Sequence, residues 1–275
     1  MKVISQSLPG FRPSRPVYRG EKGGLAPQRE RLPTHVDNHS LYTYIDRGFD
    51  IPITPTPNTL TNVMKLFLDT AIVSDIEERL SSGLIAGVTT NPTLIKKSER
   101  DPWTVYRDII ELGVDDLSIE VFGESYAELL DNSLVVNENY GNVATIKLPC
   151  TIDGLKVCKY LSKVGIRVNM TLVFSVSQAI LCGLAGATYV SPFIGRMDDN
   201  SLDGMKLIND ISNIYVAKGV KTQVLAASVR DVQSVGVAFG LGADICTIPP
   251  KVFDSMSSHV LTDKGLAQFN SDFLA

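Results

Sequence analysis

Asn142-Val143-Ala144-Thr145-Ile146-Lys147-Leu148-Pro149 is an apolar, β-branched run with one lysine near its end. The run predicts a buried strand, and a lysine is costly to bury unless its charge is removed or paired. An amine enclosed among apolar neighbours loses basicity and becomes a nucleophile toward carbonyl carbon. Lys147 is therefore a candidate for forming a Schiff base. The alternative is that its side chain extends from the strand end to water.

Similar runs recur along the chain from Met64 onward and alternate with helical patterns. The predicted strands are 65–69, 86–91, 118–122, 143–148, 167–173, 187–194, 222–228 and 243–248. The amphipathic stretches between them are 73–80, 102–112, 125–140, 153–164, 175–185, 203–218 and 229–241. Eight strand–helix units predict an α/β fold of the closed (βα)₈ type, the TIM barrel. A doubly wound open sheet is the alternative, but the chain has no GxGxxG or GxxxxGK[ST] motif, so its nucleotide-binding versions lose support.

The two ends of the chain differ from this pattern. Residues 262–275 predict an extra C-terminal helix, with Leu266, Phe269 and Phe273 on one side. That stripe needs a cover, either the flank of its own barrel or a neighbouring subunit. Residues 1–63 hold eight of the 14 prolines, and we expect a poorly structured N-terminal extension before a barrel domain of 64–275.

Three interpretations of the extension remain open. Its first twenty residues contain arginine and serine but no acidic residue, as organelle transit peptides do. Three prolines within those residues interrupt the amphipathic helix that such peptides need. Alternatively, Met64 is the natural start of the protein, or the segment is a loosely adhering extended chain.

The composition narrows the functional classes. A net charge of −4 and a pI near 5.4 argue against nucleic acid or an anionic membrane as a partner. No apolar run approaches the roughly 20 residues of a membrane span. The four cysteines lack CxxC spacing and the chain has only three histidines, so we expect neither a metal site nor a disulfide framework, and a cytoplasmic protein.

Polar residues gather where the predicted strands end. In a (βα)₈ barrel chemistry takes place at the carboxyl ends of the strands, and side chains two apart face the same way. Six of the eight runs contribute a polar side chain there, and one shared barrel mouth explains this pattern. The residues are Asp69, Thr89, Asn91, Glu120, Lys147, Asn169, Thr171 and Ser228.

Each of these residues also has a simpler interpretation. Asp69 could cap the following helix, and Asn91 before a proline could serve a turn. Glu120 could pair with a lysine on a helix, and the Thr171 hydroxyl could bond its own backbone.

The ordered set of motifs resembles the transaldolase family, specifically its small-subunit branch. The matching segments are Phe67-Leu68-Asp69-Thr70, Gly87-Val88-Thr89-Thr90-Asn91-Pro92, Ser118-Ile119-Glu120-Val121, Ile146-Lys147-Leu148-Pro149, Asn169-Met170-Thr171-Leu172 with Phe174-Ser175, and Ala226-Ala227-Ser228-Val229-Arg230. The resemblance covers residues 64 to about 275 and leaves the first 63 outside.

The resemblance implies transfer of a dihydroxyacetone unit between sugar phosphates, with neither a metal nor an organic cofactor. Lys147 would form the Schiff base, and Asp69 would be the general base at the C4 hydroxyl of the sugar. Glu120 with Thr171 would hold a water that moves protons. Asn91 and Asn169 would orient the three-carbon unit, and Thr89 would line the same face. The residues that would hold the phosphate are Arg196, Ser228 and Arg230.

The related fructose-6-phosphate aldolases, which release free dihydroxyacetone, are the alternative within the family. They resemble this chain but have glutamine at the position of Glu120 and tyrosine at that of Phe193. Phe193 lacks a hydroxyl that would activate water, so the resemblance favours transaldolase. A catalytically silent barrel that serves as a scaffold is an alternative of another class. The resemblance also implies a homo-oligomer, a pentamer or a decamer of two stacked pentamers.

Overall fold

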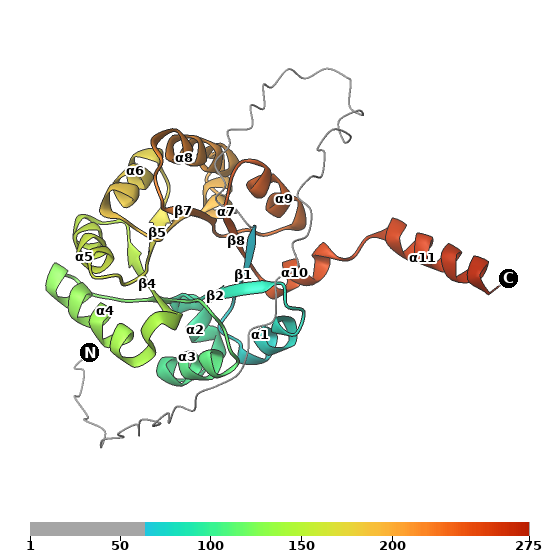
Figure 1. The fold of residues 1–275 in the computed structure, drawn as a ribbon, viewed down its shortest axis with the longest axis horizontal. Helices are drawn as coiled ribbons and strands as arrows, with labels where there is room; N and C mark the ends of the chain where they lie inside the picture. The colour runs from blue at the N-terminus through green and yellow to red at the C-terminus, as the bar shows by residue number, and fades with distance from the viewer. Residues whose placement is uncertain (1–63, 275) are drawn as a thin grey trace, which may run out of the picture. The chain divides into compact units, whose positions relative to one another are not determined.

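Residues 64–274, which the computed structural model describes, form a closed barrel of eight parallel strands. The strands pair in sequence order, and β1 closes the ring by pairing with both β2 and β8. Helices surround this ring (Figure 1). The strands are β1 (Lys65–Asp69), β2 (Ile85–Thr89), β3 (Leu117–Glu120), β4 (Ala144–Pro149), β5 (Val168–Val173), β6 (Tyr189–Pro192), β7 (Gln223–Ala226) and β8 (Ile245–Ile248). The predicted (βα)₈ barrel is confirmed.

The helices follow the strands in alternation, and most begin at a capping side chain. The Thr151 hydroxyl, for example, accepts the Gly154 N–H at 3.1 Å, and the Ser175 hydroxyl accepts the Gln178 N–H at 3.2 Å. The helices are α1 (Val73–Leu80), α2 (Pro92–Ser98), α3 (Pro102–Glu111), α4 (Tyr126–Tyr140), α5 (Ile152–Lys163), α6 (Val176–Ala185), α7 (Ile194–Asp198), α8 (Gly204–Lys218), α9 (Val232–Gly240), α10 (Pro250–Met256) and α11 (Val260–Phe273).

The sequence-based boundaries are wrong after strands six and seven. The strand predicted to reach residue 194 ends at Pro192, and Ile194 begins α7. The strand predicted to reach Ser228 ends at Ala226, and Ser228 has a left-handed backbone with φ 60°. A Cβ on Gly195 would lie 2.2 Å from the Ser228 carbonyl oxygen, so the segment after β7 packs directly on α7 at a glycine.

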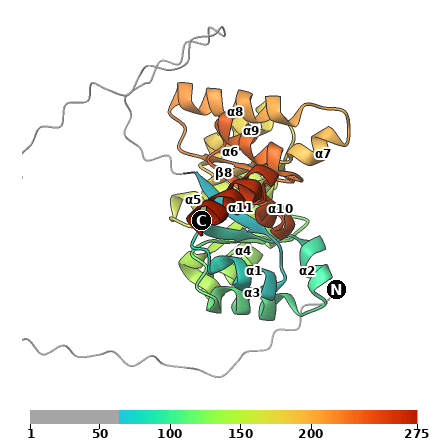
Figure 2. The same cartoon turned by 90° about the vertical axis from the view of Figure 1, so that its right-hand side faces the viewer.

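Short helices that the sequence did not predict lie at the carboxyl ends of strands. α2 follows β2 and α7 follows β6, and Figure 2 shows both at the same end of the barrel. α2 begins at Pro92, where a proline suits the first helical turn because that position needs no N–H donor. Pro92, which the sequence associates with a turn, therefore starts a helix, and α10 likewise begins at a proline, Pro250.

The barrel interior is filled by a small apolar cluster separate from the larger core under the helices. Phe67 and Tyr189 meet edge to face, with ring centroids 6.0 Å apart, and Leu225 and Ile245 pack in the same cluster. A Cβ on Gly87 would lie 2.7 Å from the Phe67 ring, so a larger residue there would collide with this packing. With this cluster filling part of the interior, polar side chains can gather at the carboxyl ends of the strands.

A buried carboxylate ties several strands together near their amino ends. Asp116, just before β3, is 4% exposed and accepts hydrogen bonds from Arg167 at 2.6 Å, Tyr189 at 2.7 Å and Thr145 at 2.8 Å. Burial raises the pKa of Asp116, while its three partners lower it. These bonds link the loop before β3 to β4, β6 and the start of β5.

The C-terminal helix is confirmed, with slightly different bounds from the predicted 262–275. α11 has no buried residue, and Leu266, Phe269 and Phe273 are 55%, 71% and 89% exposed. The interpretation that this stripe covers the flank of its own barrel is therefore wrong.

Two further predictions concern the N-terminal extension and membrane-spanning segments. The predicted extension, residues 1–63, lies outside the described residues, so the domain division at residue 64 stays a prediction. None of the helices within residues 64–274 combines the length and the apolar character that crossing a bilayer requires.

Candidate active site

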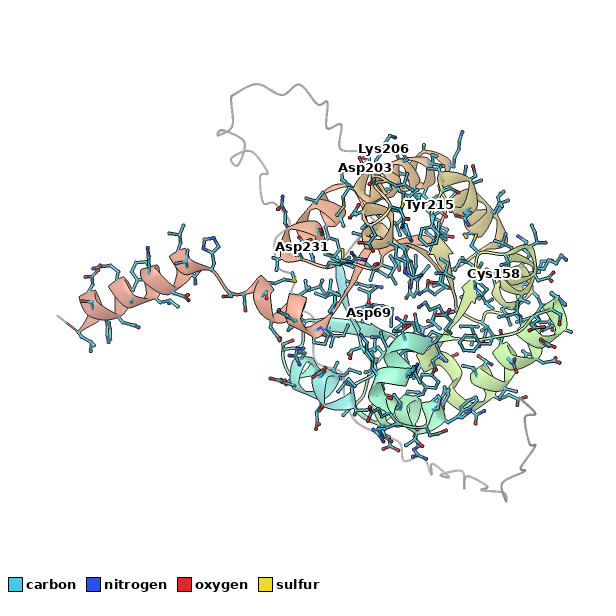
Figure 3. The ribbon with its side chains drawn as sticks, turned by 180° about the vertical axis from the view of Figure 1, so that it is seen from behind. Asp69, Cys158, Asp203, Lys206, Tyr215 and Asp231 are labelled. Atoms are coloured by element: carbon cyan, nitrogen blue, oxygen red, sulfur yellow. The ribbon has the colours of Figure 1, made fainter. Side chains whose placement is uncertain are left out.

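A polar cavity lies within the barrel, lined by residues at or near the carboxyl ends of the strands. Figure 3 views the barrel from the side opposite to that of Figure 1, with Asp69 labelled inside the ring of helices. Eight of the residues predicted from the sequence line this cavity: Asp69, Thr89, Asn91, Lys147, Asn169, Phe193, Arg196 and Ser228. The structure therefore brings the predicted nucleophile and the predicted base to one cavity.

Lys147 points into the cavity from β4 and is only 4% exposed. Its Nζ donates to the Thr90 carbonyl oxygen at 3.0 Å and forms an ion pair with Glu120 Oε2 at 3.3 Å. Glu120 and Lys147 are direct partners in the β3–β4 ladder, which fixes this pair. The alternatives of a lysine that extends to water, and of a Glu120 that pairs with a helix lysine, are both wrong.

Asp69 ends β1, and its carboxylate is held by a hydroxyl from the next strand. Thr89 Oγ1 donates to Asp69 Oδ1 at 2.8 Å, and Thr89 Oγ1 also lies 2.6 Å from Thr247 Oγ1 of β8. Burial raises the pKa of Asp69, and the Lys147 charge and the Thr89 hydrogen bond oppose that rise. The N-cap residue of α1 is Ile72, so the interpretation of Asp69 as a helix cap is wrong.

Asn91 has a role in the local backbone structure, as its simpler interpretation predicted, and it also lines the cavity. Its Oδ1 accepts the Leu94 N–H at 3.0 Å and caps α2. Because the oxygen is used in this way, the Nδ2 amide is the part of the side chain left to donate to a ligand.

Asn169 is held at both ends of its amide. Ser191 donates to its Oδ1 at 2.6 Å, and its Nδ2 donates to Ser118 Oγ at 3.2 Å. An Nδ2 group has two hydrogens, so one donor remains for the cavity. The two serines fix which end of the amide faces which neighbour.

Thr171 and Glu120 lie outside the cavity lining. Thr171 is fully buried, and its hydroxyl bonds no protein group among residues 64–274, so the interpretation that it bonds its own backbone is wrong. A buried hydroxyl without a protein partner is a position where a water can bind. Thr171 pairs with Pro149 in the β4–β5 ladder, two residues beyond the Lys147–Asn169 pair.

The predicted phosphate ligands separate into two groups. Arg196 and Ser228 line the cavity, and the Arg196 guanidinium lies 4.9 Å from the centroid of the Phe193 ring. Arg230 does not line it, because both of its terminal nitrogens bond the carboxylate of Asp199 at the end of α7. An arginine paired in this way positions the segment after β7 against α7.

Sequence reasoning missed three residues that hold the site. Thr247 lines the cavity, as does Ser191, whereas Ser118 lies behind Asn169. A signal was present, since Ser118 and Ser191 each lie two positions before a predicted site residue, Glu120 or Phe193. Side chains two apart on a strand share a face.

Within residues 64–274 there is no cluster of three or more His, Cys, Asp or Glu side chains placed to bind a metal ion.

Comparisons with known proteins place these observations among relatives. Residues 66–274 match the family model described as "Transaldolase/Fructose-6-phosphate aldolase". The chain is 47% identical over 212 residues to a "Probable transaldolase" of Symbiobacterium thermophilum, covering 77% of this chain and 98% of that protein. It is 49% identical over 210 residues to a protein of the same name from Dinoroseobacter shibae, covering 76% and 96%.

Among solved structures, the chain is similar to a flavocytochrome b2 variant with sulfite bound. The TM-score is 0.51 at 15% sequence identity, over 70% of this chain. The match spans 59% of the flavocytochrome chain, and the likeness concerns the barrel fold alone.

Proposed function

Because the chain belongs to the transaldolase and fructose-6-phosphate aldolase family, we propose that it is a transaldolase that works through a Schiff base on Lys147. It transfers a dihydroxyacetone unit from a ketose phosphate, sedoheptulose 7-phosphate or fructose 6-phosphate, to an aldose phosphate. The acceptor is glyceraldehyde 3-phosphate or erythrose 4-phosphate. The observation that supports this most strongly is a buried lysine amine and a half-buried carboxylate lining one cavity.

The first steps belong to Lys147 and Glu120. The amine of Lys147 attacks the ketose carbonyl carbon, and loss of water leaves an iminium ion. For this the amine must give up a proton, and Glu120, 3.3 Å away, is the nearest carboxylate to receive it. A water held between Glu120 and the free hydroxyl of Thr171 would pass protons during formation and hydrolysis of the iminium.

Carbon–carbon cleavage belongs to Asp69. The carboxylate takes the proton of the C4 hydroxyl, the bond between C3 and C4 breaks, and its electron pair moves into the iminium to give an enamine. The aldehyde fragment leaves. C3 of the enamine then attacks the acceptor aldehyde, and Asp69 returns the proton to the new hydroxyl before water releases the product.

Amide groups and an arginine orient the substrate. The side-chain oxygens of Asn91 and Asn169 already accept hydrogen bonds within the protein. Each side chain therefore meets the hydroxyls of the three-carbon unit with a remaining hydrogen of its Nδ2 amide. Arg196 and Ser228 lie where the phosphate of the substrate would bind, and a guanidinium suits phosphate oxygens. Arg230 supports this site through Asp199.

Transfer rather than simple cleavage is supported by Phe193. Its ring packs edge to face on Phe174, with centroids 5.9 Å apart, and faces the Arg196 guanidinium. A phenyl ring offers no hydroxyl to activate water against the enamine. The three-carbon unit then remains bound until an aldehyde acceptor arrives, whereas a fructose-6-phosphate aldolase would release it as free dihydroxyacetone.

Reduction with borohydride in the presence of fructose 6-phosphate tests the proposal. We expect a covalent adduct on the peptide that contains Lys147. A protein that gains no mass there is a silent barrel, and both enzymatic functions are then wrong. A coupled assay with and without erythrose 4-phosphate distinguishes transfer from cleavage, because turnover that is indifferent to the acceptor identifies an aldolase.

The chain would act as a homo-oligomer, a pentamer or a decamer, in the cytoplasm. The apolar stripe of α11, defined by Leu266, Phe269 and Phe273, supports an oligomer because exposed apolar side chains at this density need a partner. The free thiols of all four cysteines fit a reducing compartment.

A further inference from the structure

The carboxylate of Asp69, on β1, is the end of a series of hydrogen bonds through two threonine hydroxyls, which come from the neighbouring strands β2 and β8. We propose that Thr247 of β8 is a positioning residue for the base: its hydroxyl orients the hydroxyl of Thr89 toward Asp69. This inference rests on the proposed function, in which Asp69 moves the proton of the substrate hydroxyl.

The direction of the two hydrogen bonds follows from counting the hydrogens that each group can donate. Thr89 Oγ1 lies 2.8 Å from Asp69 Oδ1 and 2.6 Å from Thr247 Oγ1, and a threonine hydroxyl has one hydrogen to donate. An ionised carboxylate can only accept, so the Thr89 hydrogen points to Asp69. Thr247 must then be the donor to Thr89.

The fold leaves little freedom for another arrangement. β1 lies between β2 and β8 in the ring, so Asp69 has Thr89 on one side, as its register partner, and the strand of Thr247 on the other. Thr89 and Thr247 are 2% and 3% exposed, so bulk water competes little for these hydroxyls. Without the Thr247 donor, the Thr89 oxygen loses the hydrogen bond that polarises its own O–H toward the carboxylate.

The consequence is a change in how readily Asp69 ionises. The Thr89 hydrogen bond lowers the pKa of Asp69 and so opposes the rise caused by burial. A hydroxyl that itself accepts a hydrogen bond is a better donor, because such chains polarise one another. Loss of the Thr247 hydroxyl therefore weakens the bond to Asp69, raises the pKa of that carboxyl, and moves the acidic limb of the activity profile to higher pH.

The charged groups that act on Asp69 do not belong to this series of hydrogen-bonded hydroxyls. They are Lys147 of β4 and Lys97 of α2, and both favour the ionised carboxylate. Lys147 bonds Thr90 and pairs with Glu120. A substitution at Thr247 leaves these charges in place, so a shift in the profile reports the hydroxyl chain.

The test is the pH dependence of kcat/KM, which reports groups of the free enzyme, for Thr247→Val, Thr247→Ser and the matched control Ser191→Ala. Borohydride trapping on wild type comes first, because a wild type without an adduct refutes the proposed function and not this inference. We expect Thr247→Val to move the acidic limb upward by about 0.5 pH unit, the size expected for loss of polarisation along a hydrogen-bond chain. Thr247→Ser restores the wild-type limb.

Ser191→Ala removes another hydroxyl of the same cavity, one bonded to Asn169, and so lowers kcat/KM without moving the limb. The inference is overturned if Thr247→Val and wild type share one acidic limb, or if Ser191→Ala shifts it equally. If Thr247→Val does not fold, Thr247→Ala gives the same test, because it removes the hydroxyl and leaves a gap.

Discussion

Replacing Asp69 by asparagine separates two steps that the proposed mechanism assigns to different side chains. Asparagine has nearly the shape of aspartate, and its Oδ1 can still accept the Thr89 hydroxyl that lies 2.8 Å away. It has no basic oxygen for a proton. Asp69→Asn therefore keeps the cavity and the Lys147 amine but loses the general base.

The expected loss can be sized from the chemistry of proton transfer. A positioned general base contributes a factor of about 10² to 10⁴, equal to about 2.7–5.4 kcal/mol in the barrier. We expect donor cleavage to fall by that factor, while the adduct trapped on Lys147 by borohydride forms as in wild type.

The same substitution should stabilise the protein. Burial raises the pKa of Asp69 above its usual value near 3.8, so the folded state holds its proton more tightly than the unfolded state does. At neutral pH the ionised carboxylate therefore costs stability, and this cost appears as pH rises from about 3.8 through the raised value. Asparagine resembles the protonated acid and avoids the cost, so Asp69→Asn should melt at a higher temperature than wild type at pH 7.

The assay joins a coupled measurement of donor cleavage, mass analysis after borohydride and thermal melting at pH 7. Asp131→Asn, on the exposed face of α4, is the matched control, and we expect it to change none of the three. Full cleavage activity in Asp69→Asn would remove Asp69 from the mechanism. A variant that melts lower than wild type would refute the assignment of a costly buried carboxylate.

Three further outcomes are expected. Arg196→Ala should lower kcat/KM for phosphorylated donors by about 10- to 100-fold, since a hydrogen bond to a charged group is worth about 1.5–3 kcal/mol. The effect on transfer of the dihydroxyacetone unit from an unphosphorylated donor should be far smaller. An equal loss for both donors would contradict a phosphate role. Asp116→Ala should destabilise the fold by about 3 kcal/mol, because Arg167, Tyr189 and Thr145 all lose their acceptor. The melting temperature should fall by about 6–12 °C for a domain of this size, and an unchanged melting curve would refute the importance of these three hydrogen bonds. Serine at Leu266, Phe269 and Phe273 together should reduce the mass measured by light scattering to that of a smaller assembly, whereas an unchanged mass would show that another surface holds the subunits.

The fold could be predicted from the sequence because each parallel strand of a barrel is buried on both faces. Such strands are nearly continuous apolar runs, and a polar residue at a run's end is conspicuous. Asp69 and Lys147 were found in this way. The boundaries after β6 and β7 could not be, because Ser228 takes its left-handed backbone from packing on α7, a contact between segments far apart in sequence.

The supporting residues of the site were harder to find for a related reason. Threonine and serine are common in strands and at helix caps, so Thr247 and Ser118 stand out only when their partners across the barrel are known. The pairing of Arg230 with Asp199 is of the same kind, since the motif alone suggests a free phosphate ligand. Residue type and strand position predict a polar mouth, whereas the hydrogen-bond partners depend on the closed ring.

The most direct test of the account is the site of the covalent adduct after borohydride reduction with fructose 6-phosphate. We predict a mass gain confined to the Lys147 peptide. It should be absent in Lys147→Met and absent from the exposed Lys156, which pairs with Asp153 on the surface. An adduct on another lysine, or no adduct in a folded wild-type protein, would contradict it.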